Sequence, residues 1–63
     1  MKGVVVSYGF KNEYGFIRSP DVVKDVFFHR RDCGVTVPAP GTQVEFEIRE
    51  INGNLRAGKV RAV

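Results

Sequence analysis

Two neighbouring apolar segments constrain the fold of this chain most strongly. Residues 13–18 (EYGFIR) and 25–30 (DVFFHR) resemble β-strands, and each carries large apolar side chains at both odd and even positions. Side chains alternate between the two faces of a strand, so both faces of each segment are apolar. A chain of 63 residues buries only about 60% of its unfolded surface, around a single core. One face of each segment must therefore lie at the surface.

The alternation divides these side chains into two sets. The set expected inside the protein consists of Gly15, Ile17, Val26 and Phe28. The set expected outside consists of Tyr14, Phe16, Phe27 and His29. An exposed group of aromatic rings lowers solubility and commonly marks a binding site. The alternative is a different strand register, in which these rings pack into the core.

The rest of the chain also has the character of short strands. Five segments are separated by Gly, Pro, Asn and Asp, and none has convincing helical periodicity. These segments are residues 2–8, 13–18, 25–29, 42–51 and 55–63. The connection over residues 30–41 contains Gly34, Pro38 and Pro40, so it accommodates at most a short helical turn.

A closed barrel is the architecture that these strands favour. Residues 42–51 alternate between apolar and polar side chains, and Asn52-Gly53 predicts a tight type I′ hairpin to the last strand. Five short antiparallel strands would leave exposed edges unless the sheet closes on itself. The sequence therefore predicts an all-β, five-stranded antiparallel β-barrel, with residues 1–63 as one domain.

Composition restricts the classes of function. Ten Lys and Arg residues outnumber seven Asp and Glu residues, and this net charge of +3 favours an anionic partner. One Cys and one His cannot build a disulfide framework or a four-ligand zinc site. Glu45 and Glu47 share a strand face, but no third group accompanies them as an active site would require. We expect no enzyme activity, no metal or other cofactor, and no small-molecule substrate.

No segment has the roughly 18 to 20 consecutive apolar residues of a membrane helix, and no secretory signal is visible. We therefore expect a cytoplasmic protein without a membrane partner. For a small barrel with an aromatic face, a monomer and a strand-exchanged dimer both remain open.

Short strings over essentially the whole chain resemble a cold-shock domain. They are Gly3-Val4-Val5, Tyr14-Gly15-Phe16-Ile17, Asp25-Val26-Phe27-Phe28-His29, Gly41, Val44-Glu45-Phe46 and Ala57-Gly58-Lys59-Val60. The second string matches the family's first ribonucleoprotein motif, and residues 26–29 match the second motif. The resemblance implies an OB-fold barrel whose second and third strands hold single-stranded RNA or DNA, often as an RNA chaperone or a regulator of gene expression.

The chain departs from the family pattern at several positions. Ser7 stands where the family usually has a stacking Trp, and Asn12-Glu13 replaces the usual Lys-Gly. Arg30 replaces a Phe, although its guanidinium is still able to stack or to pair with phosphate. This divergent member is therefore expected to bind more weakly, or with different tuning, than a standard cold-shock domain.

Aromatic rings beside cations provide what unpaired bases and their phosphates need. The residues predicted to bind nucleic acid are Tyr8, Lys11, Tyr14, Phe16, Arg18, Phe27, His29, Arg30 and Arg56. For Tyr8 the alternative is that its ring simply caps the barrel. The rival function is a protein-interaction or oligomerisation barrel, in which the same rings bind a peptide or a second subunit.

Overall fold

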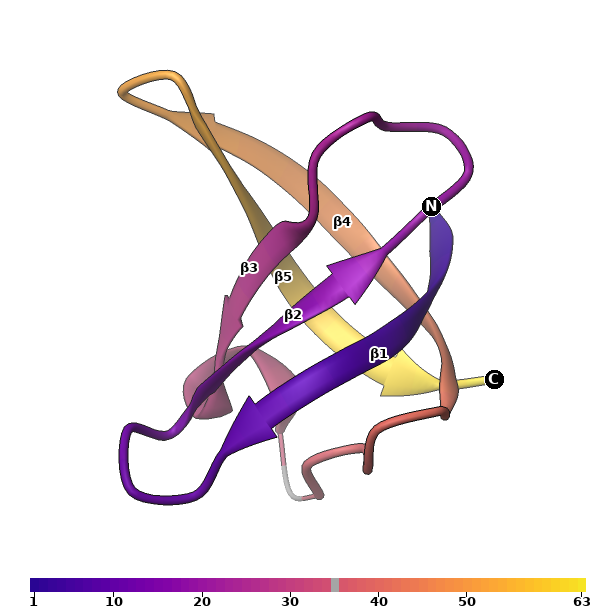
Figure 1. Ribbon diagram of the computed structural model, residues 1–63, viewed down its shortest axis with the longest axis vertical. Helices are drawn as coiled ribbons and strands as arrows, with labels where there is room; N and C mark the ends of the chain where they lie inside the picture. Colours follow the sequence, from indigo (N-terminus) through magenta and orange to yellow (C-terminus); the bar gives the residue numbers. More distant parts are fainter. Residues whose placement is uncertain (35) are drawn as a thin grey trace.

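The computed structural model describes residues 1–34 and 36–63. Its strands form a closed barrel in the order β1-β2-β3-β5-β4 (Figure 1). They are β1 (Lys2–Gly9), β2 (Tyr14–Arg18), β3 (Val26–His29), β4 (Gln43–Ile51) and β5 (Asn54–Ala62). A short 3-10 helix, η1 (Arg30–Cys33), follows β3. The predicted all-β, five-stranded barrel is confirmed, and every strand boundary lies within one residue of its predicted position.

Closure of the barrel adds one feature to the predicted antiparallel arrangement. Four neighbouring strand pairs are antiparallel, whereas β3 and β5 run parallel and are paired only at Phe27 and Arg56. An odd number of strands cannot alternate in direction all the way round a closed ring. One pair of neighbouring strands must therefore be parallel. Because β3 and β5 are paired at a single position, the two strands are free to diverge elsewhere.

The core lies inside the barrel and is built from the inward set of side chains. Ile17, Val26 and Phe28 are completely buried, and Val5, Val44, Phe46, Ala57 and Val60 complete the cluster with Cys33. Gly15 is buried at a position where an added Cβ would overlap with the Phe28 ring and the carbonyl oxygen of Ser7. The alternation in β2 and β3 thus places the aliphatic side chains and Phe28 inside and the remaining rings outside.

Two local features set the register around this core. Asn52 and Gly53 have φ angles of 52° and 82°, as a type I′ turn requires, so the predicted β4–β5 hairpin is confirmed. In β1 the register shifts between Val5 and Ser7, because one extra residue is inserted there. The bulge keeps Val5 in the core and brings Ser7 opposite Phe16.

No helix among the described residues is long and apolar enough to cross a membrane.

Candidate nucleic-acid interface

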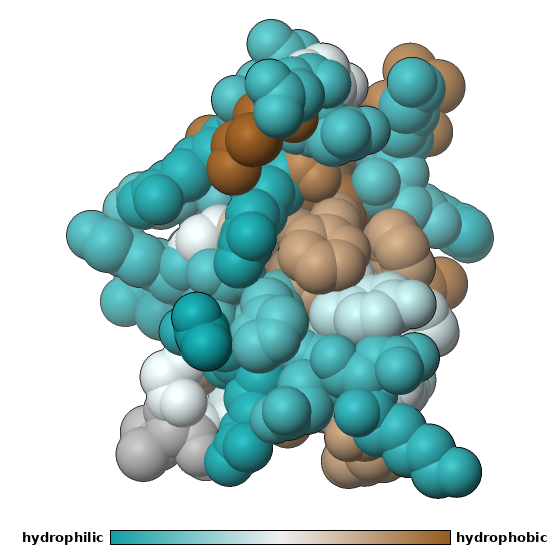
Figure 2. All heavy atoms as spheres, turned by 90° about the vertical axis from the view of Figure 1, so that its left-hand side faces the viewer, coloured by the Kyte–Doolittle hydropathy of each residue, from teal (hydrophilic) through white to brown (hydrophobic). Residues whose placement is uncertain are grey.

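Three aromatic rings lie together on the outside of β2 and β3, and we call Tyr14, Phe16 and Phe27 the aromatic face. Phe16 and Phe27 are directly opposite each other in the register of the two strands. Ring centroids are 5.3 Å apart for Tyr14 and Phe27, and 6.1 Å apart for each of the other two pairs. Figure 2 shows apolar side chains gathered in the middle of this side of the barrel, among hydrophilic ones.

The rings are accessible although they touch one another. Tyr14 is 36% exposed, and Phe16 and Phe27 are half-buried, whereas Phe28 beside them on the inner side has no exposed surface. Ser7 lies opposite Phe16 across the β1–β2 pair. A small hydroxymethyl group therefore stands where an aromatic residue would add a fourth ring to the aromatic face. The aromatic face therefore offers three ring surfaces.

His29 borders the aromatic face opposite Tyr14 and is held by the first turn of η1. Its Nδ1 accepts a hydrogen bond from the N–H of Arg31 at 3.1 Å, and its own N–H donates to the Asp32 carboxylate at 2.9 Å. With Nδ1 acting as an acceptor, the neutral ring carries its proton on Nε2. The hydrogen bond from Arg31 thus orients the imidazole, which presents an N–H donor at Nε2, whereas the hydrogen bond to Asp32 fixes the backbone of His29.

Arg56 joins the aromatic face from β5, across the parallel junction. Its guanidinium carbon lies 5.5 Å from the centroid of the Phe27 ring, and an Nη atom lies 3.4 Å from the Asp32 carboxylate. The cation–π contact and the ion pair both hold this guanidinium beside the rings. Arg56 is thus a predicted cation in direct contact with a ring of the aromatic face.

The other predicted cations stand at the margins. Arg18 pairs with Asp25 at 3.3 Å, and Arg30 pairs with Glu13 at 2.9 Å. The hydrogen bond from Arg30 lowers the pKa of the Glu13 carboxyl, which is therefore ionised at neutral pH. Lys11 lies exposed in the β1–β2 turn. Like Arg56, both of these arginines therefore already form an ion pair with a carboxylate.

Tyr8 occupies a different place from the aromatic face. It is paired with Gly15 in the register of β1 and β2, and its ring stacks on the buried Phe28 with centroids 5.9 Å apart. The exposed Phe10 ring meets it edge-on at 5.2 Å. The half-buried Tyr8 ring therefore packs against the core, as the capping alternative expects, and its role in binding stays a prediction.

A groove of about 480 Å³ continues from the aromatic face towards the β4–β5 hairpin. Phe16, Phe27 and Arg56 form part of its lining, and residues absent from the sequence-based prediction form the rest. The additional residues are Lys24, Asp25, Ile51, Asn52, Asn54 and Leu55. Asn52-Gly53 predicts the hairpin itself. Its position opposite the β2–β3 loop follows from the pairing of β3 with β5, which closes the barrel.

Cys33 is set apart from this surface by burial. Desolvation, with a smaller contribution from the Asp32 charge, raises the pKa of its thiol to about 11, so the group is neutral at pH 7. Within residues 1–34 and 36–63, no three His, Cys, Asp or Glu side chains gather as a metal site would require.

The matches to known proteins include a family model and a solved structure. The sequence matches the family model described as "'Cold-shock' DNA-binding domain" over residues 1–63. The structure is similar to a solved Drosophila Unr CSD456 chain, with a TM-score of 0.83 and 20% sequence identity over 98% of the present chain. The present chain spans only 26% of that structure. At this level of identity the structural similarity concerns the fold.

Proposed function

The chain belongs to the cold-shock domain family, which is a nucleic-acid-binding family and not a known enzyme family, and we propose that it binds single-stranded RNA or DNA by stacking bases on the aromatic face. The observation that supports this proposal is the position of Tyr14, Phe16 and Phe27 outside a core that is complete without them. Unpaired bases stack on such rings, whereas bases within a duplex are already stacked on one another.

The expected affinity follows from the number of rings. Base–aromatic stacking contributes about 1–3 kcal/mol per base, so three rings contribute about 3–9 kcal/mol before the cost of ordering the strand. Arg56, placed over Phe27, adds a cation beside the stacked bases. Stacking tolerates any base, because every base has a π surface. Moderate affinity and low sequence preference suit an RNA chaperone or a regulator that keeps transcripts unfolded.

A protein-interaction barrel that uses the same rings is the second candidate. The ion pairs Arg18–Asp25, Arg30–Glu13 and Arg56–Asp32 favour it, because they neutralise cations that a phosphate backbone would otherwise meet. Phosphate contacts release counterions and make binding strongly salt-dependent, whereas an apolar protein contact responds little to salt.

A salt titration separates the two candidates. We expect a fluorescently labelled, pyrimidine-rich single strand to bind, with log K falling by about 0.7 per phosphate contact for each log unit of salt. The label belongs on the oligonucleotide, because the protein has no Trp. The same strand annealed to its complement is the control and should bind more weakly. Absence of single-strand binding at low salt, with salt-insensitive self-association or peptide binding, would instead support the protein-interaction barrel.

A further inference from the structure

Glu13 and Arg30 face each other at the end of the β2–β3 ladder, one rung beyond the Tyr14–His29 pair. The N–H of Arg30 donates to the carbonyl oxygen of Glu13 at 2.8 Å, and the guanidinium Nη1 donates to the carboxylate at 2.9 Å. Both backbone and side chain therefore connect the residue that precedes Tyr14 with the residue that follows His29. The ion pair borders the predicted binding surface directly.

The backbone conformation of Glu13 is unfavourable for glutamate. Its φ angle is 60°, in the left-handed region where a Cβ atom is unfavourable and glycine is the usual residue. The turn itself uses only backbone atoms of Glu13, whose N–H donates to the carbonyl oxygen of Gly9 at 2.7 Å. Glycine would make the same turn without strain. The interaction with Arg30 is thus the contribution that the Glu13 side chain makes.

We propose that the Glu13 carboxylate competes with the phosphates of a bound strand for the Arg30 guanidinium, and so sets the affinity of the aromatic face. This inference rests on the proposed function. A phosphate that approaches Arg30 has to replace one anion by another, so it gains little. Glu13 would thereby weaken binding and reduce its salt dependence, leaving stacking as the dominant contribution.

The exposure of the pair makes this exchange feasible. The side chains of Arg30 and Glu13 are 65% and 45% exposed, and exposed ion pairs are weak enough to open. Around them lies a hollow that is also lined by His29, Arg31 and Gly34. Arg31 adds a second positive charge there, so an incoming phosphate meets two arginines once the carboxylate has moved aside.

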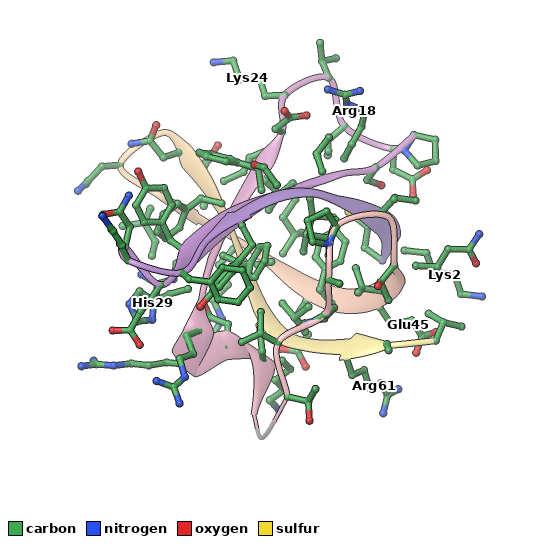
Figure 3. All side chains as sticks on the ribbon, turned by 60° about the horizontal axis from the view of Figure 1, so that its bottom comes forward. Lys2, Arg18, Lys24, His29, Glu45 and Arg61 are labelled. Atoms are coloured by element: carbon green, nitrogen blue, oxygen red, sulfur yellow. The ribbon has the colours of Figure 1, made fainter. Side chains whose placement is uncertain are left out.

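The barrel contains a matched control for this pair. Glu45 and Arg61 are also directly opposed across two antiparallel strands, and their side chains approach to 3.0 Å. Figure 3 shows them across the molecule from His29, which adjoins Arg30. Glu45→Gln thus removes the same charge from an equivalent exposed ion pair, at a site screened from the aromatic face by the width of the barrel.

The test compares Kd values of these variants for a short oligothymidylate. We expect Glu13→Gln to bind roughly three- to fivefold more tightly than the wild type, as expected for release of one exposed ion pair. Its salt dependence should become steeper by about 0.7 log unit per log unit of salt, which is one additional phosphate contact. Glu13→Gly, which suits the φ angle, should show the same gain, and Glu45→Gln should change Kd by less than about 1.5-fold.

A protein that carries Arg30→Gln identifies the origin of the gain in affinity. Combined with Glu13→Gln, it should abolish the gain, because no guanidinium remains to be released. Equal Kd values for Glu13→Gln and Glu45→Gln, or a gain that persists without Arg30, would overturn the proposal. If the wild type binds and loses affinity when its rings are removed, such a result refutes only the role of Glu13. If the wild type binds no single strand, the proposed function itself fails.

Discussion

Replacing Gly15 with Ala should destabilise the barrel by about 3 kcal/mol or more, because the added methyl group has no space. A Cβ on Gly15 would lie 2.9 Å from the Phe28 ring and in steric overlap with the carbonyl oxygen of Ser7. The ring is completely buried and the oxygen belongs to the backbone of β1, so neither moves aside cheaply. Overpacking of a core costs about 1–3 kcal/mol and sometimes more.

The size of this loss matters because the domain is small. At about 0.05–0.15 kcal/mol per residue, its total stability is about 3–9 kcal/mol. Urea denaturation followed by circular dichroism should therefore show Gly15→Ala partly or fully unfolded in buffer. Gly9→Ala is the matched control, because a Cβ on Gly9 would meet its nearest neighbour at an ordinary 3.7 Å. Equal midpoints for the two variants would contradict the close β1–β2 contact.

Replacing Phe16 and Phe27 together by Ala should abolish measurable binding to short single strands. Each ring is expected to contribute about 1–3 kcal/mol of stacking, so the loss corresponds to about 30-fold at the least and to more than 10⁴-fold at the most. Removal of Phe27 also deprives Arg56 of the ring beneath its guanidinium. Fluorescence anisotropy with a labelled oligonucleotide measures the loss.

The barrel should remain folded in this variant, because both rings lie outside the core. Phe16 and Phe27 are half-buried, and neither belongs to the cluster around Phe28 and Ile17. Phe10→Ala is a suitable control, because the Phe10 ring is 84% exposed in the β1–β2 turn and packs on Tyr8 instead of on a ring of the aromatic face. A double variant that is folded and binds as well as Phe10→Ala would remove the aromatic face as the binding site.

The strands and their faces were predictable because local rules decide them. The alternation in residues 13–18 and 25–30, together with a core large enough for only one face, separates Ile17 and Phe28 from Phe16 and Phe27. Asn52-Gly53 places the β4–β5 hairpin through its positive φ angles alone. Such features depend on neighbours in the sequence, and they agree with the structure to within one residue.

Features that depend on contacts between distant strands were not predictable from local patterns. The bulge after Val5 shifts Tyr8 towards Gly15 and the end of the barrel, and no residue type in β1 signals it. The ion pairs of Arg30 with Glu13 and of Arg56 with Asp32 join residues 17 and 24 positions apart. The groove beside the hairpin exists because β3 and β5 meet at a single rung.

Residue-resolved chemical shifts during titration with a short single-stranded oligonucleotide test the central claim most directly. We expect the largest changes at Tyr14, Phe16, Phe27 and the adjoining His29, and the smallest at Glu45 and Arg61 on the opposite side of the barrel. Changes centred on β4 and β5 around Glu45, with the signals of the three rings unmoved, would contradict the account.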